Sequence, residues 1–267
     1  MDNGLLKHSW FSRWITLFAW LGYLFLAIPT LVIVLSAFSP TPYPSFPPES
    51  LSLKWFGEVF GDADWMHAIW MSAVLVLVVT PITTVLGSLA AYGLRRVGGR
   101  LHSLLQTFLL SPLMVPEIVL GMALLYLFIA LGMNGSFFAL VAGHALICFP
   151  YVVRNVSVSL AGIDPKLEDA ALNLGASRWA VFRTIIIPLA LPGIIAGAIF
   201  SSVMSLGEVS ISLLVSAPDT ITVPVRVFSY IDQTFDPSVN AVAVIFIAIA
   251  VVAMLALDRV IGLQRVF

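Results

Sequence analysis

Two carboxylates, Glu117 and Glu208, lie inside long apolar stretches of the sequence. An ionised group at membrane depth is costly, so it normally faces protein or water. Ser201, Ser205 and Ser212 recur with Glu208 at helical spacing, which predicts one polar stripe on an apolar helix. Two acids and such a stripe would suit a pathway for a cationic solute. A structural interpretation is also open, because serine hydroxyls donate to carbonyls of their own helix and one Glu can pair with a neighbouring helix.

The rest of the sequence offers few groups for catalysis or metal binding. The four histidines are scattered, and His144 is interpreted as a hydrogen-bonding or packing residue rather than a metal ligand. Neither H-E-x-x-H nor G-x-S-x-G occurs, and the G-x-x-x-x-G-K-[ST] loop that holds ATP phosphates is absent from the sequence. We therefore expect a non-enzymatic chain with no metal, no cofactor of its own and no nucleic-acid partner.

Composition indicates the kind of elements that position these residues. Hydrophobic residues make up 60% of the 267 residues and charged residues only 10%, which a soluble core of this size would not need. Six apolar runs are each long enough to cross a bilayer core of about 30 Å at about 1.5 Å per residue. The sequence thus predicts an all-α, polytopic membrane protein with six transmembrane helices in a single domain, 1–267. The runs span residues 14–38, 69–94, 103–131, 137–160, 189–215 and 239–258.

Basic residues mark alternate loops of this chain. They gather before the first run and after the second, fourth and sixth, whereas the other loops hold only Lys54 and Arg226 among acidic residues. The positive-inside rule then places both termini and the segment 164–188 in the cytoplasm. The first run is interpreted as a retained anchor, since it is longer than the apolar part of a signal peptide. The basic residues of the cytoplasmic side are Lys7, Arg13, Arg95, Arg96, Arg100, Lys166, Arg178, Arg183, Arg259 and Arg265.

The segment 164–188 reads as two short helices joined by a glycine. Asp164 suits an N-cap and Pro165 the first helical position, Gly175 can take a left-handed turn, and Ser177 can cap a second helix that runs to Pro188. Physics alone leaves two interpretations open, a docking surface for a partner or an amphipathic hairpin packed under its own bundle. A narrow apolar stripe follows the first helix at Leu167, Ala170, Ala171 and Leu174.

The stretch DAALNLGASRWAVFRTIIIP resembles the cytoplasmic signature of binding-protein-dependent ABC importer permeases. That signature begins Glu-Ala-Ala, has a glycine six residues after the Glu and ends near Ile-x-Leu-Pro. Asp169 replaces the usual Glu and Ile187 the usual Leu, both conservatively. In that family the segment is the coupling helix, which docks into a groove on the cytoplasmic ATPase. The resemblance therefore implies that ATPase coupling falls to Asp169, Ala170, Ala171, Leu174 and Gly175.

Other segments, among them SPLMVPEIVLG, GHALICFPYVV and MSLGEVSISLLVSAP, are similar to the second permease subunit of spermidine/putrescine-type importers. The resemblance implies the type I ABC importer permease fold and a place in the bacterial cytoplasmic (inner) membrane. It also implies a second homologous permease subunit, two cytoplasmic ATPase subunits that carry ATP and magnesium, and an external, periplasmic substrate-binding protein. Membrane lipid is the remaining expected partner.

The expected function is that of the permease in an ATP-driven importer of a small polar, amine-containing, polyamine-like solute. Polyamine-type relatives often carry an acidic pair where this chain has Gly207 and Glu208, so the site holds less negative charge. An amino acid, an opine or an aminophosphonate is therefore the alternative cargo. A stand-alone channel or secondary transporter is a further alternative, and it would show repeats or broken helices around a central site.

Overall fold

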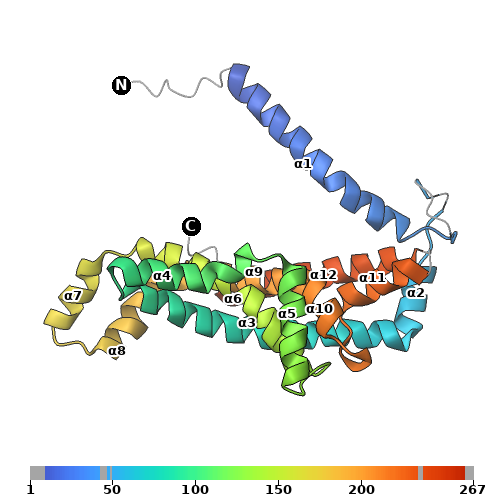
Figure 1. Ribbon diagram of the computed structural model, residues 1–267. Coiled ribbons are helices and arrows are strands. Elements are labelled where there is room, and N and C mark those ends of the chain that lie inside the picture. The colour runs from blue at the N-terminus through green and yellow to red at the C-terminus, as the bar shows by residue number, and fades with distance from the viewer. Residues whose placement is uncertain (1–9, 43–46, 49, 234–236, 262–267) are drawn as a thin grey trace. The chain divides into compact units, whose positions relative to one another are not determined.

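The computed structural model describes residues 10–42, 47–48, 50–233 and 237–261 (Figure 1), without the side chains of 10–13, 233 and 253–261. These residues form helices and no strand, so the predicted all-α class is confirmed. They belong to two compact units, Met1–Asp62 with Tyr230–Ala248 and Ala63–Ser229 with Ile249–Phe267. The basic side chains of Lys7, Arg13, Arg259 and Arg265 lie outside the described part.

The smaller unit contains the long apolar helix α1 (Trp10–Ser36) and the short helix α2 (Lys54–Gly61). α2 buries Trp55 and Val59 on one face and exposes Lys54, Glu58 and Phe60. The indole Nε1 of Trp55 donates to the carbonyl of Ser39 over 2.7 Å. This bond fixes α2 to the chain that follows α1, because a buried indole N–H needs an acceptor.

Three long helices form the centre of the larger unit: α3 (Ala63–Arg95), α6 (Phe137–Ala161) and α9 (Ile187–Gly207). Glycines let these helices approach closely. A Cβ added at Gly193 would lie 2.5 Å from the Cβ of Ser159 on α6, and one at Gly87 would lie 2.7 Å from the Cβ of Val152. Small residues at such contacts allow the backbone packing on which helix association in lipid depends.

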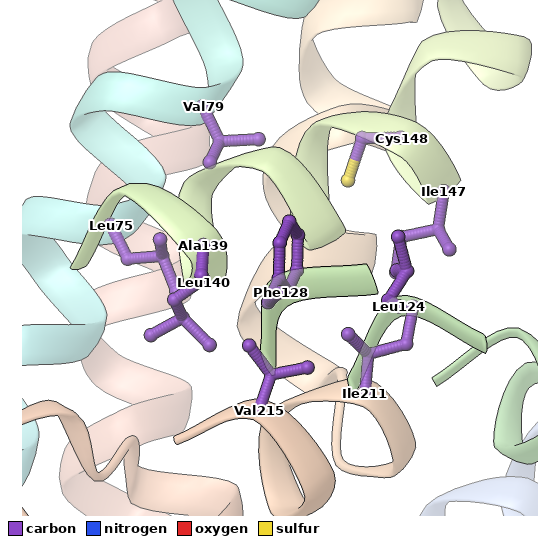
Figure 2. Packing of buried hydrophobic residues seen from close by; sticks show 10 residues of the cluster. All are labelled: Leu75, Val79, Leu124, Phe128, Ala139, Leu140, Ile147, Cys148, Ile211 and Val215. Carbon is purple, nitrogen blue, oxygen red and sulfur yellow. The ribbon is translucent and has the colours of Figure 1, made fainter. Parts of the chain in front are cut away.

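Two shorter helices, α5 (Glu117–Ala130) and α10 (Ser210–Val215), close one end of this core. Leu124 and Phe128 of α5 and Ile211 and Val215 of α10 pack together against Leu140 of α6 (Figure 2). A second apolar cluster, with Val152 and Val156 at its centre, lies at the other end of α3 and α6. The larger unit therefore has two apolar clusters, one at each end of α3 and α6.

Two of the predicted spans are not continuous helices. The run 103–131 forms α4 (Gly99–Leu110), the 3₁₀ turn η1 (Ser111–Met114) and α5, with a bend of 99° between the helices. Pro116 stands at the bend, where it cannot donate a backbone hydrogen bond. The run 189–215 breaks between α9 and α10, so that Glu208 and Val209 are outside both helices.

The count of six spans is compatible with these helices without being established by them. Within the described residues, four helices are long and apolar enough to cross a membrane, or five if the bent pair α4–α5 is one span. The sixth predicted run falls on α12 (Ser238–Ile261), whose described apolar part, Ser238–Val252, is shorter than a span. A short 3₁₀ helix, η3 (Pro218–Thr220), precedes helix α11 (Val223–Gln233).

The segment 164–188 follows its local signals closely. Helix α7 (Pro165–Asn173) begins after Asp164, whose side chain accepts from the N–H of Lys166 over 2.9 Å. Gly175 has φ +89°, and Ser177 caps α8 (Arg178–Val181) by accepting from Ala180 over 3.1 Å. The predicted cap, left-handed turn and second cap are all confirmed.

The end of this segment differs from the prediction. The second helix does not stop at Pro188 but continues through one wide π turn, η2 (Phe182–Ile186), into α9. A proline inside a helix clashes with the carbonyl four residues earlier, and a wide turn at that place relieves the clash. The apolar helix that was predicted to begin at 189 is therefore continuous from Arg178 to Gly207.

Candidate functional site

Three of the predicted coupling residues, Asp169, Ala170 and Ala171, lie on α7, and Leu174 and Gly175 lie on the turn that follows it. Asp169, Ala170, Leu174 and Gly175 are exposed, and Leu174 is 89% exposed, whereas Ala171 faces the apolar cluster at the end of α3 and α6. Figure 1 shows α7 and α8 beyond the ends of α3 and α4. This hairpin, residues 164–188, therefore presents an exposed leucine and small residues, while one face rests on its own bundle.

Glu168 holds the hairpin to α3, although sequence reasoning did not single it out. It is buried, with 6% of its surface exposed. Its carboxylate lies 3.1 Å from the guanidinium of Arg95 and 2.5 Å from that of Arg96. The only signal in the sequence was an acid next to the family signature and an arginine pair in the preceding loop, 72 residues away.

The two arginines also bind other groups at the end of the bundle. Arg95 donates to the carbonyls of Leu160 and Ile163 over 2.9 and 3.1 Å, which satisfies carbonyls at the end of α6. Arg96 donates to the hydroxyl of Tyr92 and lies over its ring. The pKa of Arg96 is raised above its ordinary value, first by the hydrogen bond with Tyr92 and further by the carboxylate of Glu168.

The second arm of the hairpin contacts the same end of α3 through aromatic rings. Phe182 lies 4.8 Å from the ring of Tyr92, measured between centroids, and Trp179 lies 5.6 Å from Phe182. Both arms are therefore joined to one set of residues, Tyr92, Arg95 and Arg96, which we call the α3 anchor. A force applied to the hairpin would reach α3 and α6 through these contacts.

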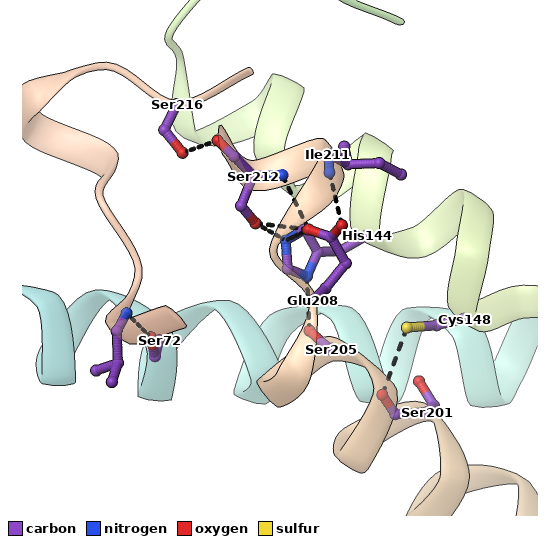
Figure 3. Close-up of polar contacts among 10 residues, drawn as sticks. Ser72, His144, Cys148, Ser201, Ser205, Glu208, Ile211, Ser212 and Ser216 are labelled. Atoms are coloured by element: carbon purple, nitrogen blue, oxygen red, sulfur yellow. Dashed lines mark hydrogen bonds and ion pairs between the residues drawn. The ribbon is translucent and has the colours of Figure 1, made fainter. Parts of the chain in front are cut away.

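A second polar cluster is buried where α9 breaks (Figure 3). The carboxylate of Glu208 accepts hydrogen bonds from the backbone N–H groups of Ile211, over 2.6 Å, and Ser212, over 2.9 Å. It also accepts from the Ser212 hydroxyl over 2.8 Å. The first N–H groups of a helix have no intrahelical partner, so Glu208 caps α10. Glu208 itself is only 4% exposed.

His144 of α6 bridges the two sides of the break. Its Nδ1 lies 2.9 Å from the Ser205 hydroxyl and its Nε2 lies 2.7 Å from the Ser212 hydroxyl. Because the single proton of the Ser212 hydroxyl goes to Glu208, that oxygen accepts from Nε2–H, and Nδ1 of a neutral ring accepts from Ser205. The prediction that His144 is a hydrogen-bonding residue is confirmed.

The predicted polar stripe is thus not on one continuous helix. Ser205, Glu208 and Ser212 surround His144, while the Ser201 hydroxyl is 2.7 Å from that of Thr83 on α3. All four stripe residues are buried and hydrogen-bonded within the described chain. Their lining of a substrate pathway stays a prediction.

Glu117 makes no hydrogen bond or ion pair with this cluster within the described residues. It is the first residue of α5, directly after the bend, and it is exposed. Tyr151 of α6 is near Glu117, and its ring is parallel to that of Phe200 with 6.5 Å between centroids. An exposed carboxylate beside aromatic rings is an arrangement that attracts organic cations. No group of three or more potential metal ligands occurs among the residues that the structure describes.

Comparison with known proteins supports a transport role. Residues 83–264 match the family model described as binding-protein-dependent transport system inner membrane component. The chain is 30% identical to the spermidine/putrescine transport system permease protein PotC of Escherichia coli (strain K12), over 88% of each chain. It is also 30% identical to the putrescine transport system permease protein PotI of the same strain, over 92% of this chain and 90% of PotI.

The fold has a solved counterpart. A chain in the crystal structure of a bacterial ABC transporter involved in the import of the acidic polysaccharide alginate superposes with a TM-score of 0.73. The alignment covers 96% of each chain at 15% sequence identity. This likeness shows the fold of an ABC importer permease and says nothing of cargo.

Proposed function

Since the chain belongs to the family of binding-protein-dependent transport system inner membrane components, we propose that it is the permease subunit that passes a small, amine-containing, polyamine-like solute inward. The observation that supports this most strongly is the similarity to two polyamine permeases over about nine-tenths of the chain. ABC importers are driven by ATP, and this sequence has no phosphate-binding loop. ATP and magnesium are accordingly assigned to a separate ATPase.

The proposed partners follow from the surfaces of the chain. We assign the exposed side of the hairpin, with Asp169, Ala170, Leu174 and Gly175, to the groove of a cytoplasmic ATPase. Leu167 and Trp179, which are 47% and 67% exposed, extend the apolar part of this surface. Two such ATPase subunits, a second homologous permease and an external binding protein complete the proposed assembly in the bacterial inner membrane.

The proposal that the cargo carries a positive charge rests on Glu117. The exposed carboxylate and the stacked rings of Tyr151 and Phe200 would attract an ammonium group through charge and cation–π contacts. The Glu208 carboxylate already accepts three hydrogen bonds from Ile211 and Ser212 of α10. We therefore propose that Glu208 contributes to the pathway by shaping the break between α9 and α10. Polyamine-type relatives often have an acidic residue where this chain has Gly207, so this chain has one negative charge fewer at that place. An amino acid, an opine or an aminophosphonate therefore remains the second candidate cargo.

Orientation in the membrane gives the first testable prediction. A single cysteine at Ser177 is expected to react with a membrane-impermeant maleimide only after the cytoplasmic side is opened, because basic residues cluster on that side. Cysteines at Ser50 or Asp219 are expected to react in intact cells. All three positions are exposed, and the native Cys148 is buried, so the unmodified chain serves as the unlabelled control. Labelling of Ser177 in intact cells would place the hairpin outside and contradict ATPase docking.

Cargo charge gives a second prediction. Replacing Glu117 by Gln is expected to lower uptake of spermidine or putrescine by about tenfold, the size of one lost charge contact with an organic cation. Uptake is measured with the reconstituted importer in proteoliposomes. Glu58→Gln is the matched control, because Glu58 is an exposed carboxylate in a surface pair with Lys54. If the Glu117 variant takes up amines as fast as the wild type, Glu117 is not part of the pathway. If the wild-type importer takes up only neutral or anionic solutes, the cargo is not polyamine-like.

A further inference from the structure

A cavity of about 650 Å³ lies between α3, α4 and α6, and neither Glu208 nor Glu117 is among its lining residues. Its walls include Leu94 and Arg95 at the end of α3 and Leu160 and Ala161 at the end of α6, so it belongs to the same end of the bundle as the hairpin. Helix α4 forms its third wall, and Figure 1 shows α4 running beside α3. Nothing in the coupling or pathway proposals uses this cavity.

The charge of the cavity is positive. Two arginines, Arg95 and Arg154, line it together with His102 and Gln106, and the lining includes no carboxylate. Arg95 already has Glu168 and two carbonyls as partners. Arg154, by contrast, is an exposed side chain that makes no hydrogen bond or ion pair with any residue in the described part of the chain. A cationic amine would be repelled here, so the cavity calls for an anion.

The depth of Arg154 narrows the choice of anion. Arg154 stands seven residues before Ala161, the last residue of α6, which corresponds to about 10 Å along the helix axis. The headgroup layer on each side of a bilayer core is roughly 5–8 Å thick, so a guanidinium on its long stem can reach the phosphate level. Leu110, Leu113 and Val158 supply apolar surface in the same cavity.

We propose that this cavity binds an anionic phospholipid of the cytoplasmic leaflet, with its phosphate on Arg154 and an acyl chain along the leucines of α4 and η1. Basic cavities between membrane helices on the cytoplasmic side are suited to such headgroups because charge and hydrophobic contact act together. Gln106 supplies further N–H donors to the phosphate. The choice of leaflet rests on the proposed orientation of the hairpin, whereas the choice of a phospholipid rests on the lining of the cavity and on the position of Arg154 along α6.

The experiment measures lipid retained by the purified importer complex in native mass spectrometry. The complex is supplied with phosphatidylglycerol or with phosphatidylcholine, and retention is compared between the wild type, Arg154→Gln and Arg154→Lys. Loss of the Arg154 charge is expected to weaken phosphatidylglycerol retention about fivefold, as for one basic residue at a lipid surface. The lysine variant should retain most of the binding, and phosphatidylcholine should respond to neither change.

Arg100→Gln is the matched control, since Arg100 is an exposed arginine of α4 that does not line the cavity. It should retain phosphatidylglycerol like the wild type. Equal retention by the wild type and Arg154→Gln would overturn the proposal, as would an equal loss in the Arg100 variant. Displacement of the lipid by inorganic phosphate, at a lipid concentration below the critical micelle concentration, would show that the site binds free phosphate. That result would also overturn the proposal. A change in transport without a change in lipid retention would concern the proposed function and not this cavity.

Discussion

Replacing Glu168 by Gln is expected to abolish most of the stimulation of ATP hydrolysis that a loaded binding protein causes in the assembled importer. The amide cannot neutralise Arg95 and Arg96, whose guanidinium groups lie 3.1 and 2.5 Å from the carboxylate. Breaking one partner of a buried pair costs about 3–5 kcal/mol, and the cost here falls at or below the lower end because Arg96 is half exposed. The first arm of the hairpin should then be held less tightly to α3, while the second arm keeps the contact of Phe182 with Tyr92.

The control variants separate anchoring from docking. Asp169→Asn changes an exposed acid beside Glu168, at the acidic position of the family signature, and should weaken co-purification of the ATPase. Glu168→Gln should keep the ATPase bound while its hydrolysis no longer responds to cargo. Glu58→Gln, which disrupts only an exposed pair, should change neither. Full cargo-stimulated hydrolysis in the Glu168 variant would show that the α3 anchor is not needed to transmit the signal.

Local features of the hairpin were predictable because each depends on a few adjacent residues. A cap needs an acceptor side chain two or three residues before the N–H it binds, and Asp164 and Ser177 meet that condition. The left-handed turn needs a residue without a Cβ, which Gly175 supplies. The role of Glu168 depends instead on arginines of another helix, and no periodicity within α7 distinguishes it from the exposed Asp169.

The breaks within two of the predicted spans, by contrast, could not be predicted from hydropathy. Hydropathy detects an apolar run but does not register a break inside it, so the runs at 103–131 and 189–215 were read as continuous. At the second break a carboxylate replaces the missing backbone acceptors, and the stripe of Ser201, Ser205, Glu208 and Ser212 was the visible sign of it. The spacing correctly indicated that these residues belong together, but their partner His144 comes from α6.

Function was predictable chiefly through the family signature. The hydrophobic pattern alone gives a membrane protein with an amphipathic hairpin, which a channel or a secondary transporter would also allow. The stretch from Asp169 to Pro188 narrows this to the permease of a binding-protein-dependent importer, and the family match at 83–264 agrees with it. The separate ATPase belongs to the proposed function. Cargo is less well specified, since it depends on a few side chains such as Glu117.

The last prediction concerns Glu208, for which two roles give different results. As the cap of α10, Glu208 accepts three hydrogen bonds in a buried site. A Gln at 208 keeps one acceptor oxygen and turns an NH₂ group toward the remaining donors, so at least one buried donor loses its partner. Each such loss costs about 1–3 kcal/mol. The apparent unfolding temperature of the purified complex should therefore fall by roughly 2–10 °C.

Uptake separates this structural role from direct contact with cargo. If Glu208 only caps α10, the Glu208→Gln variant should lose uptake of amine, neutral and anionic test solutes alike, in proportion to its loss of stability. If Glu208 instead faces a cationic cargo, amine uptake should fall alone while the unfolding temperature stays at the wild-type value. Glu117→Gln is the natural comparison, because Glu117 is exposed and its change should leave the unfolding temperature unaltered. An unchanged unfolding temperature in Glu208→Gln would reject the cap as a stabilising element and return Glu208 to the pathway.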